Sequence, residues 1–192
     1  QGPATSAADW YAKGYDKMFP DANKYIPTPT PTPSPMPSQY GNLWAQEMAK
    51  HPSLPSYTSN LIINSENGRQ DPKAINKNTN GTWDVGLTQV NVDPKNAAEV
   101  RRLQYDPAYN IQQGMNKLDR YTANMQDPVL GLAAYNLGPN GVIQNPENAL
   151  KRAQWVYWKA GIPMPQTPFT QNPQGFIASH MQDYQTAGLL PK

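Results

Sequence analysis

The sequence predicts a mainly α-helical domain with one small β-hairpin beside a candidate active-site cleft. Four residues recur at the spacing of one helix face: Ile111, Met115, Leu118 and Thr122. Proline and glycine mark the helix ends, and residues 74–86 contain two short strand-like stretches around an Asn80-Gly81 turn. With 192 residues, the chain has room for one domain of ordinary size plus appendages.

Each expected helix has its own boundary signal. The first ends before Pro52, and the second is closed by Gly68, a residue type that commonly follows the last helical turn. Two later helices begin at an Asp-Pro pair, which combines a capping carboxylate with a proline at the first helical position. In chain order, the expected helices span residues 42–50, 56–67, 107–122, 128–137, 146–160 and 172–187.

Alternating prolines set the domain boundaries. Residues 26–37 carry a proline at every second position, which forbids helix and favours an extended polyproline II spacer. We therefore expect four regions: a short N-terminal aromatic segment at 1–25, a Pro/Thr-rich linker at 26–38, the main domain at 39–161, and a Pro-rich bend with a C-terminal helix at 162–192 that packs on or extends this domain.

Composition argues against several classes of protein. Lys and Arg number 16 and Asp and Glu number 14, giving a net charge of +2 without a basic block, so neither nucleic acid nor an anionic membrane is an expected partner. The absence of cysteine excludes disulfides and thiolate chemistry, and two histidines are too few for a His-rich metal site. No run of 18 apolar residues is present, so no membrane span is expected.

Glu66 is the first candidate for chemistry. On a helix it lies one turn beyond Ile62 and Ile63, so its carboxyl group shares a face with residues that should point at the core. Burial there would raise the pKa of the carboxyl group, as a general acid working near neutral pH requires. A glutamate near a helix end can equally be a solvated or hydrogen-bonded residue.

Two amide-rich segments are the other candidates. In residues 86–91, Gln89 and Asn91 follow a glycine that permits close backbone approach, and their amides offer the donors and acceptors that hydroxyl-rich and N-acetylated ligands need. In residues 133–139, Asn136 lies on an apolar helix face, and Tyr135 follows Gly131 by one turn, where the missing side chain leaves room for another element. Taken by itself, this second segment can equally well be interpreted as a helix end with a buried amide.

The order of these segments resembles a known family. Ser65-Glu66, then Gly86-Leu-x-Gln-Val-Asn91, then Ala134-Tyr-Asn-x-Gly-Pro139 is similar to the catalytic domain of the lytic transglycosylases of the lysozyme-like superfamily. The segment from Asp106 to Gly114 matches as well, and Asn110 is expected to tie a turn. The hairpin sequence is most similar to small cell-wall lytic enzymes that accompany conjugation and secretion systems and phage virions.

The resemblance, over residues 56–145, implies an α+β lysozyme-like catalytic domain within 39–161. Its substrate would be the glycan strands of peptidoglycan, and Glu66 would be the general acid and base that cuts the bond between N-acetylmuramic acid and N-acetylglucosamine. The products would carry 1,6-anhydromuramoyl ends, formed with no metal or other cofactor. Gln89 and Asn91 would line the subsites, Tyr135 would position Glu66, and Asn136 would hold its helix against the segment around Gln89.

Three further residues keep alternatives open. Asn67 stands where the family usually has serine, and it would bind or position the substrate across the cleft. Trp83, on the hairpin, is a candidate for stacking on a sugar face or for simple packing. Asp84 either pairs within the hairpin or acts as the second carboxylate of a muramidase, which would hydrolyse the same bond.

The resemblance also implies a location and a carrier. We expect the protein in the periplasm, in the cell envelope, in the secreted fraction or on a virion, delivered by a larger secretion, conjugation or virion assembly. A non-catalytic module that binds peptidoglycan is the second alternative to the lyase.

Overall fold

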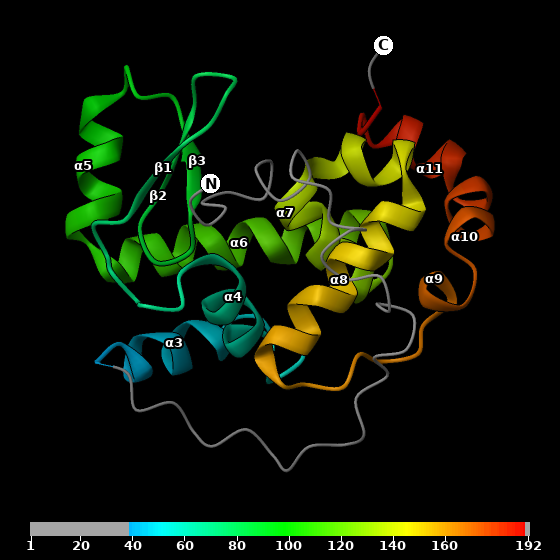
Figure 1. Cartoon of the computed structure of the whole chain (residues 1–192), viewed down its shortest axis with the longest axis horizontal. Helices are drawn as coiled ribbons and strands as arrows, with labels where there is room; N and C mark the ends of the chain where they lie inside the picture. Colours follow the sequence, from blue (N-terminus) through cyan, green and yellow to red (C-terminus); the bar gives the residue numbers. More distant parts are fainter. Residues whose placement is uncertain (1–38, 191–192) are drawn as a thin grey trace, which may run out of the picture. The chain divides into compact units, whose positions relative to one another are not determined.

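The computed structural model describes residues 39–190 (Figure 1). These residues form two compact units, 39–116 and 117–190, each with its own elements and core. The N-terminal segment and the linker predicted at 1–38 lie outside the described residues.

The first unit contains helices around a small sheet. Its elements in chain order are α3 (Gly41–Met48), α4 (Thr58–Glu66), β1 (Ile75–Lys77), β2 (Trp83–Val85), β3 (Val90–Val92), α5 (Ala97–Tyr105) and the first part of α6 (Pro107–Met125). Helices therefore formed at both predicted N-terminal ranges, and the fold class, mainly α with a small antiparallel sheet, is confirmed. Helix α5 was not predicted from the sequence.

The predicted hairpin is part of a three-stranded antiparallel sheet of order β1-β2-β3. Its first two strands pair Asn76 with Asp84, and Asn78 and Gly81 close the turn through a backbone hydrogen bond of 3.0 Å. The third strand, Val90–Val92, pairs with β2 and was not expected, because its first two residues lie within the segment that was interpreted only as a ligand site.

The two faces of the sheet differ in chemistry, because successive side chains on a strand point to opposite sides. One face packs on α5 through a cluster of Val85, Val100 and Leu103. Partly buried hydrophobic residues pack against this cluster: Ile75, Trp83, Val90, Val92 and Tyr109. The other face carries a row of polar residues paired across the three strands: Asn76, Asp84 and Asn91.

A fully buried asparagine, Asn110 of α6, joins this sheet to the helices. Its amide nitrogen donates to the carbonyl oxygens of Val85 (2.9 Å) and Leu103 (3.1 Å). Its Oδ1 accepts from the backbone N–H of Thr88 (2.9 Å), and the Thr88 hydroxyl donates to the backbone carbonyl of Asn110 (3.0 Å). One side chain therefore connects β2, the turn after it, α5 and α6, as expected of a residue that ties a turn.

The second unit is helical. It contains the rest of α6, then α7 (Pro128–Gln144), α8 (Pro146–Ala160), α9 (Pro168–Gln171), α10 (Pro173–Ser179) and α11 (Met181–Thr186). The helix expected at 128–137 does stop being helical at Gly138 (φ 75°, ψ 153°), and a second helical segment starts at Pro139. The single helix expected at 172–187 is two short helices that meet at His180.

The close approach predicted at Gly131 is confirmed. A β-carbon added to Gly131 would lie 2.6 Å from the α-carbon of Thr122 in α6, so only glycine lets α6 and α7 pack at this distance. At the same end of the unit, Asp127 caps α7 by accepting from the backbone N–H groups of Val129 (2.9 Å) and Leu130 (3.0 Å).

Substituting Asn110 tests the joint between the sheet and the helices. Asn110→Ala leaves the buried N–H of Thr88 and the carbonyl oxygens of Val85 and Leu103 without partners. We expect the free energy of unfolding to fall by about 3 kcal/mol or more, measured by urea denaturation. Asn116→Ala, at an exposed position of the same helix, is the control and should change stability little; equal effects of the two variants would contradict the role given to Asn110.

Tyr184 provides a pH-dependent test of the second unit. Its buried hydroxyl donates to the carbonyl oxygen of Met125 (3.1 Å), and burial, together with the negative charges of Asp127 and Asp183, raises its pKa to about 12. The neutral phenol is therefore favoured in the folded state, and its contribution to stability is lost as pH rises from about 10 to about 12.

We expect Tyr184→Phe to be less stable than the wild type near pH 8 and the stability gap to narrow towards pH 12. Urea midpoints measured over this pH range test the expectation. Tyr105→Phe, at a 64% exposed side chain, controls for the substitution itself. A gap that stays constant with pH would show that the Tyr184 hydroxyl does not titrate as described.

Candidate active site

Glu66 is the last residue of α4 and is half-buried. The helix ends there because Asn67 leaves helical geometry (φ −146°, ψ 73°). Ile62 and Ile63 are buried one turn earlier, so Glu66 follows the apolar face of the helix as the sequence indicated. The hydroxyl of Ser65 donates a hydrogen bond to Glu66 Oε1 (3.1 Å), and this bond restricts the orientation of the carboxylate.

Asn67 fastens the end of α4 to the rest of the first unit. Its buried amide nitrogen donates to the carbonyl oxygens of Asp71 (2.6 Å) and Gly86 (3.2 Å). Its Oδ1 accepts from the backbone N–H of Asp71 (3.2 Å). Because Asn67 directly follows Glu66, these bonds fix the candidate acid relative to the turn that follows β2. A serine could not span both Asp71 and Gly86 in this way.

Gly86 is the point at which several constraints meet. Its φ of 79° suits glycine, and a β-carbon would clash with the side chain of Asn110 and lie 2.9 Å from the carbonyl oxygen of Leu103. Its carbonyl oxygen accepts from Asn67 and from the Gln89 side chain (2.7 Å). This single carbonyl therefore connects the Glu66 helix to the turn between β2 and β3.

Gln89 is buried and has a left-handed backbone (φ 50°), a conformation that costs a non-glycine residue about 1 kcal/mol or more. Its side chain accepts a hydrogen bond from the Asn76 amide and donates to the Gly86 carbonyl. Both ends of the Gln89 amide are therefore used within the protein, and the residue holds the turn closed.

Asp84 and Asn91 lie side by side on the polar face of the sheet. The Asn91 amide donates to Asp84 Oδ1 (2.8 Å) and to the hydroxyl of Thr82 (2.7 Å). Asn91 is exposed and Asp84 is half-exposed, so both remain accessible to a ligand in water. The carboxylate is thus paired within the sheet, by a side-chain amide.

Trp83 lies on the other face of the sheet. Its ring packs partly buried against the Val85 cluster, and Lys77 Nζ is 5.2 Å from the ring centroid. This is a packing position on the α5 side, and the sugar contact considered for Trp83 stays a prediction.

Tyr135 and Asn136 belong to α7 of the second unit. Tyr135 is buried, and Lys117 Nζ is 4.6 Å from its ring centroid. Asn136 Oδ1 accepts from the guanidinium of Arg152 in α8, including a bond of 3.1 Å from Nε, and its amide nitrogen donates to the carbonyl oxygen of Leu132 (3.1 Å). Asn136 therefore joins α7 to α8.

Three residues that support these side chains were not predicted from the sequence: Ser65, Asn76 and Arg152. Ser65 had the clearest signal, since its hydroxyl directly precedes the candidate acid. Asn76 alternates with Ile75 on a strand, which places it on the polar face. Arg152 is buried on an otherwise apolar helix face, and a charged side chain at such a position needs a polar partner.

Two other kinds of site are absent from the described residues 39–190. These residues contain no group of three or more His, Asp or Glu side chains that could hold a metal ion. None of the helices in this part of the chain is long and apolar enough to cross a membrane.

A helical domain with a small antiparallel sheet, and a glutamate that ends a helix held to that sheet, has the features of lysozyme-like glycan-cleaving proteins. Residues 43–158, more than half of the chain, match the family model of the Transglycosylase SLT domain. The chain belongs to this family, which supports cleavage of peptidoglycan as its general activity. No curated protein and no solved structure gives a significant match to the chain.

Gly86 tests the link between the Glu66 helix and the sheet. Gly86→Ala should lower the free energy of unfolding by about 2 kcal/mol or more, because the β-carbon clashes with Asn110 and the positive φ disfavours alanine. Gly68→Ala is the control, since a β-carbon added at Gly68 would have no atom within 4 Å. Urea denaturation of both proteins measures the difference; a Gly86 variant as stable as the control would argue against the tight packing of this turn.

Proposed function

We propose that this protein is a lytic transglycosylase that cuts the β-1,4 bond between N-acetylmuramic acid and N-acetylglucosamine, with Glu66 as the general acid and base. Membership of the SLT family supports the substrate class and the general activity. The observation that carries the residue assignment is the position of Glu66, half-buried at the end of α4 and held by Ser65 and the Asn67 link.

The proposed reaction uses one carboxyl group twice. Protonated Glu66 gives its proton to the glycosidic oxygen, and the bond from the anomeric carbon of the muramoyl residue to that oxygen breaks. The Glu66 carboxylate then takes the proton of the muramoyl 6-hydroxyl as that oxygen attacks the anomeric carbon. The products are a free 4-hydroxyl on N-acetylglucosamine and a 1,6-anhydromuramoyl end. Water is not consumed, and Glu66 ends protonated.

The other site residues are proposed to act in two ways. Asn91, exposed on the polar face of the sheet, would contact N-acetyl or hydroxyl groups of the substrate. Gln89 and Asn67 are used in bonds within the protein, so their first role would be to position the turn and the acid. Tyr135 would hydrogen-bond near Glu66, and Asn136 would hold its helix in place.

Asp84 has a different role in the lyase and in the muramidase. A carboxylate that pairs with a neighbouring amide is accounted for as part of the sheet, whereas a muramidase would need Asp84 to stabilise or attack the anomeric centre. We further propose that the enzyme acts outside the cytoplasm, carried by a secretion, conjugation or virion assembly.

Glu66→Gln tests the assignment of the acid. We expect turnover of purified peptidoglycan to fall roughly 100- to 10,000-fold, because the amide can neither give nor take the proton, while binding of the glycan persists. Soluble products quantified by mass spectrometry measure the effect. Glu147→Gln, at an exposed position of α8, is the control and should retain activity.

The products distinguish the three candidate functions. Wild-type products that are lighter by one water and lack a reducing end identify the lyase, and Asp84→Asn should then retain substantial activity. Reducing products that disappear with Asp84→Asn would identify a muramidase instead. If Glu66→Gln cuts as fast as the wild type, Glu66 is not the catalytic acid, and wild-type protein that binds but does not cut is a binding module.

A further inference from the structure

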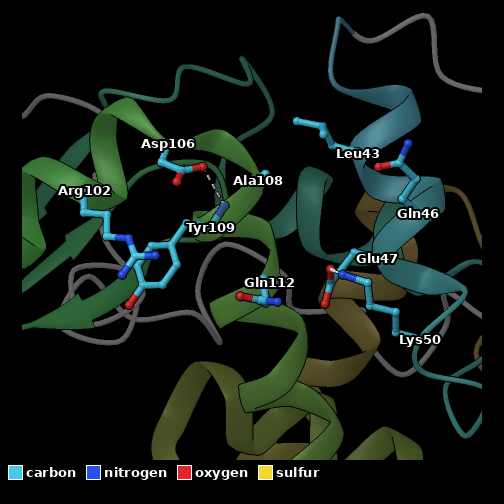
Figure 2. Close-up of a pocket in the computed structure, with 9 residues that line it drawn as sticks. All are labelled: Leu43, Gln46, Glu47, Lys50, Arg102, Asp106, Ala108, Tyr109 and Gln112. Atoms are coloured by element: carbon cyan, nitrogen blue, oxygen red, sulfur yellow. Dashed lines mark hydrogen bonds and ion pairs between the residues drawn. The ribbon is translucent and has the colours of Figure 1, made fainter.

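A cavity of about 200 Å³ in the first unit lies between α3 and the junction of α5 with α6 (Figure 2), and no residue assigned to catalysis lines it. Leu43, Gln46, Glu47 and Lys50 line it from α3, and Figure 2 shows the remaining lining residues on the opposite side. These are Arg102, Asp106, Ala108, Tyr109 and Gln112. The proposed reaction uses none of them.

The α5–α6 wall presents a cation and an anion together. The Arg102 guanidinium lies 3.6 Å from the centroid of the Tyr109 ring, and the Tyr109 hydroxyl donates to Glu99 (2.8 Å), which anchors the ring. Stacking uses the flat face of a guanidinium and leaves its N–H edge able to bind a carboxylate through two hydrogen bonds. Asp106 uses Oδ1 to accept the backbone N–H of Tyr109 (3.0 Å), so its second oxygen can face the cavity.

The α3 wall also has both charges, but there they are paired with each other. Buried Glu47 accepts from Lys50 (2.7 Å) and lies within hydrogen-bond distance of His51. Lys50 and Gln46 are exposed. Within the described part of the chain, the side-chain amides of Gln46 and Gln112 have no hydrogen-bond partner, so each wall offers an amide to a ligand.

The arrangement selects for a small ligand of mixed charge. A phosphate or another simple anion would meet the carboxylates of Glu47 and Asp106, and a simple cation would meet Arg102. Sites for drug-sized ligands are typically about 300–1,000 Å³, so this cavity suits a chain end rather than a disaccharide. Opposite charges flanked by amides match the free end of a peptide that bears its C-terminal carboxylate and a side-chain ammonium group, with peptide N–H and C=O groups between them.

We propose that this cavity binds the free end of the peptides attached to the glycan strands of peptidoglycan, through the C-terminal carboxylate and a side-chain ammonium group near it. The peptide carboxylate binds the edge of Arg102, the ammonium group binds Asp106, and Gln46 and Gln112 bind the peptide backbone. The identity of the peptide rests on the proposed function. The cavity then favours strands that still carry peptides over strands that have lost them.

The first experiment compares two substrates. Peptide-bearing glycan strands and the same strands stripped by an amidase are digested by the wild type, Arg102→Gln and Arg101→Gln. Arg101 is the matched control, because it is exposed, precedes Arg102 on α5 and does not line the cavity. We expect the wild type and Arg101→Gln to cut peptide-bearing strands about 3- to 10-fold faster, the size of one charge-assisted pair at an exposed site.

Arg102→Gln should lose this preference and keep its rate on stripped strands, and Gln46→Ala, on the opposite wall, should reduce the preference. Equal wild-type rates on the two substrates, or a preference that survives Arg102→Gln, would overturn the proposal.

The second experiment does not depend on cutting. A synthetic copy of the peptide, with its N-terminus acetylated to reproduce the amide bond to the glycan, is titrated into isotope-labelled protein, and backbone amide shifts are recorded by NMR. Shifts in α3 and at the α5–α6 junction that are lost in Arg102→Gln, and weakened when the side-chain amino group of the peptide is acetylated as well, support the cavity as the site. Absence of these shifts refutes it. Protein that cuts neither strand would refute the proposed function alone, and the titration would still decide the peptide site.

Discussion

The first unit depends on the satisfaction of buried polar groups by one side chain, that of Asn110. Three-residue strands are too short to form a stable sheet alone, so the sheet needs an external support. Asn110 supplies it by bonding Val85 in the central strand, Thr88 in the next turn and Leu103 in α5. Each of these groups is buried, and leaving any of them unpaired costs free energy comparable to a lost hydrogen bond. The packing of Val85 on Val100 and Leu103 then follows from the same alignment.

The candidate acid is positioned through this support by a short chain of bonds. Asn110 and the tight packing around Gly86 fix the position of the Gly86 carbonyl, and Asn67 binds that carbonyl directly after Glu66. Gln89 binds the same oxygen and closes the turn against Asn76. The amides near the acid therefore serve first as internal scaffold. Exposed polar groups of the sheet, such as Asn91, remain open to solvent.

Local sequence signals predicted the helices that have strong boundaries. Asp106-Pro107 and Asp127-Pro128 each combine a cap with a proline, and helices begin at both. The helix α5 was missed because only Val100 and Leu103 are buried among its charged and polar residues. Its amphipathic character becomes meaningful only when the sheet that it covers is known.

The candidate site was predicted in part, for a related reason. Glu66 was identifiable because an acid at the end of an apolar helix face conflicts with its surroundings. The roles of Asn67 and Gln89 depend on partners such as Gly86 and Asn76, which the turn brings together only in three dimensions. The cavity beside Arg102 has no sequence signal either, because its walls come from segments about fifty residues apart.

The two-faced sheet has a consequence for how such an enzyme could diversify. Each strand gives alternate residues to the α5 core and to the polar face, so the apolar residues are constrained by packing and the polar ones by hydrogen bonds. Asn76 is held by its bond to Gln89, whereas exchanges at Asp84 and Asn91 leave both that turn and the apolar side untouched. Residues that pack the core and residues that face water are thereby separate positions among the same nine strand residues, and relatives could change one set while inheriting the other.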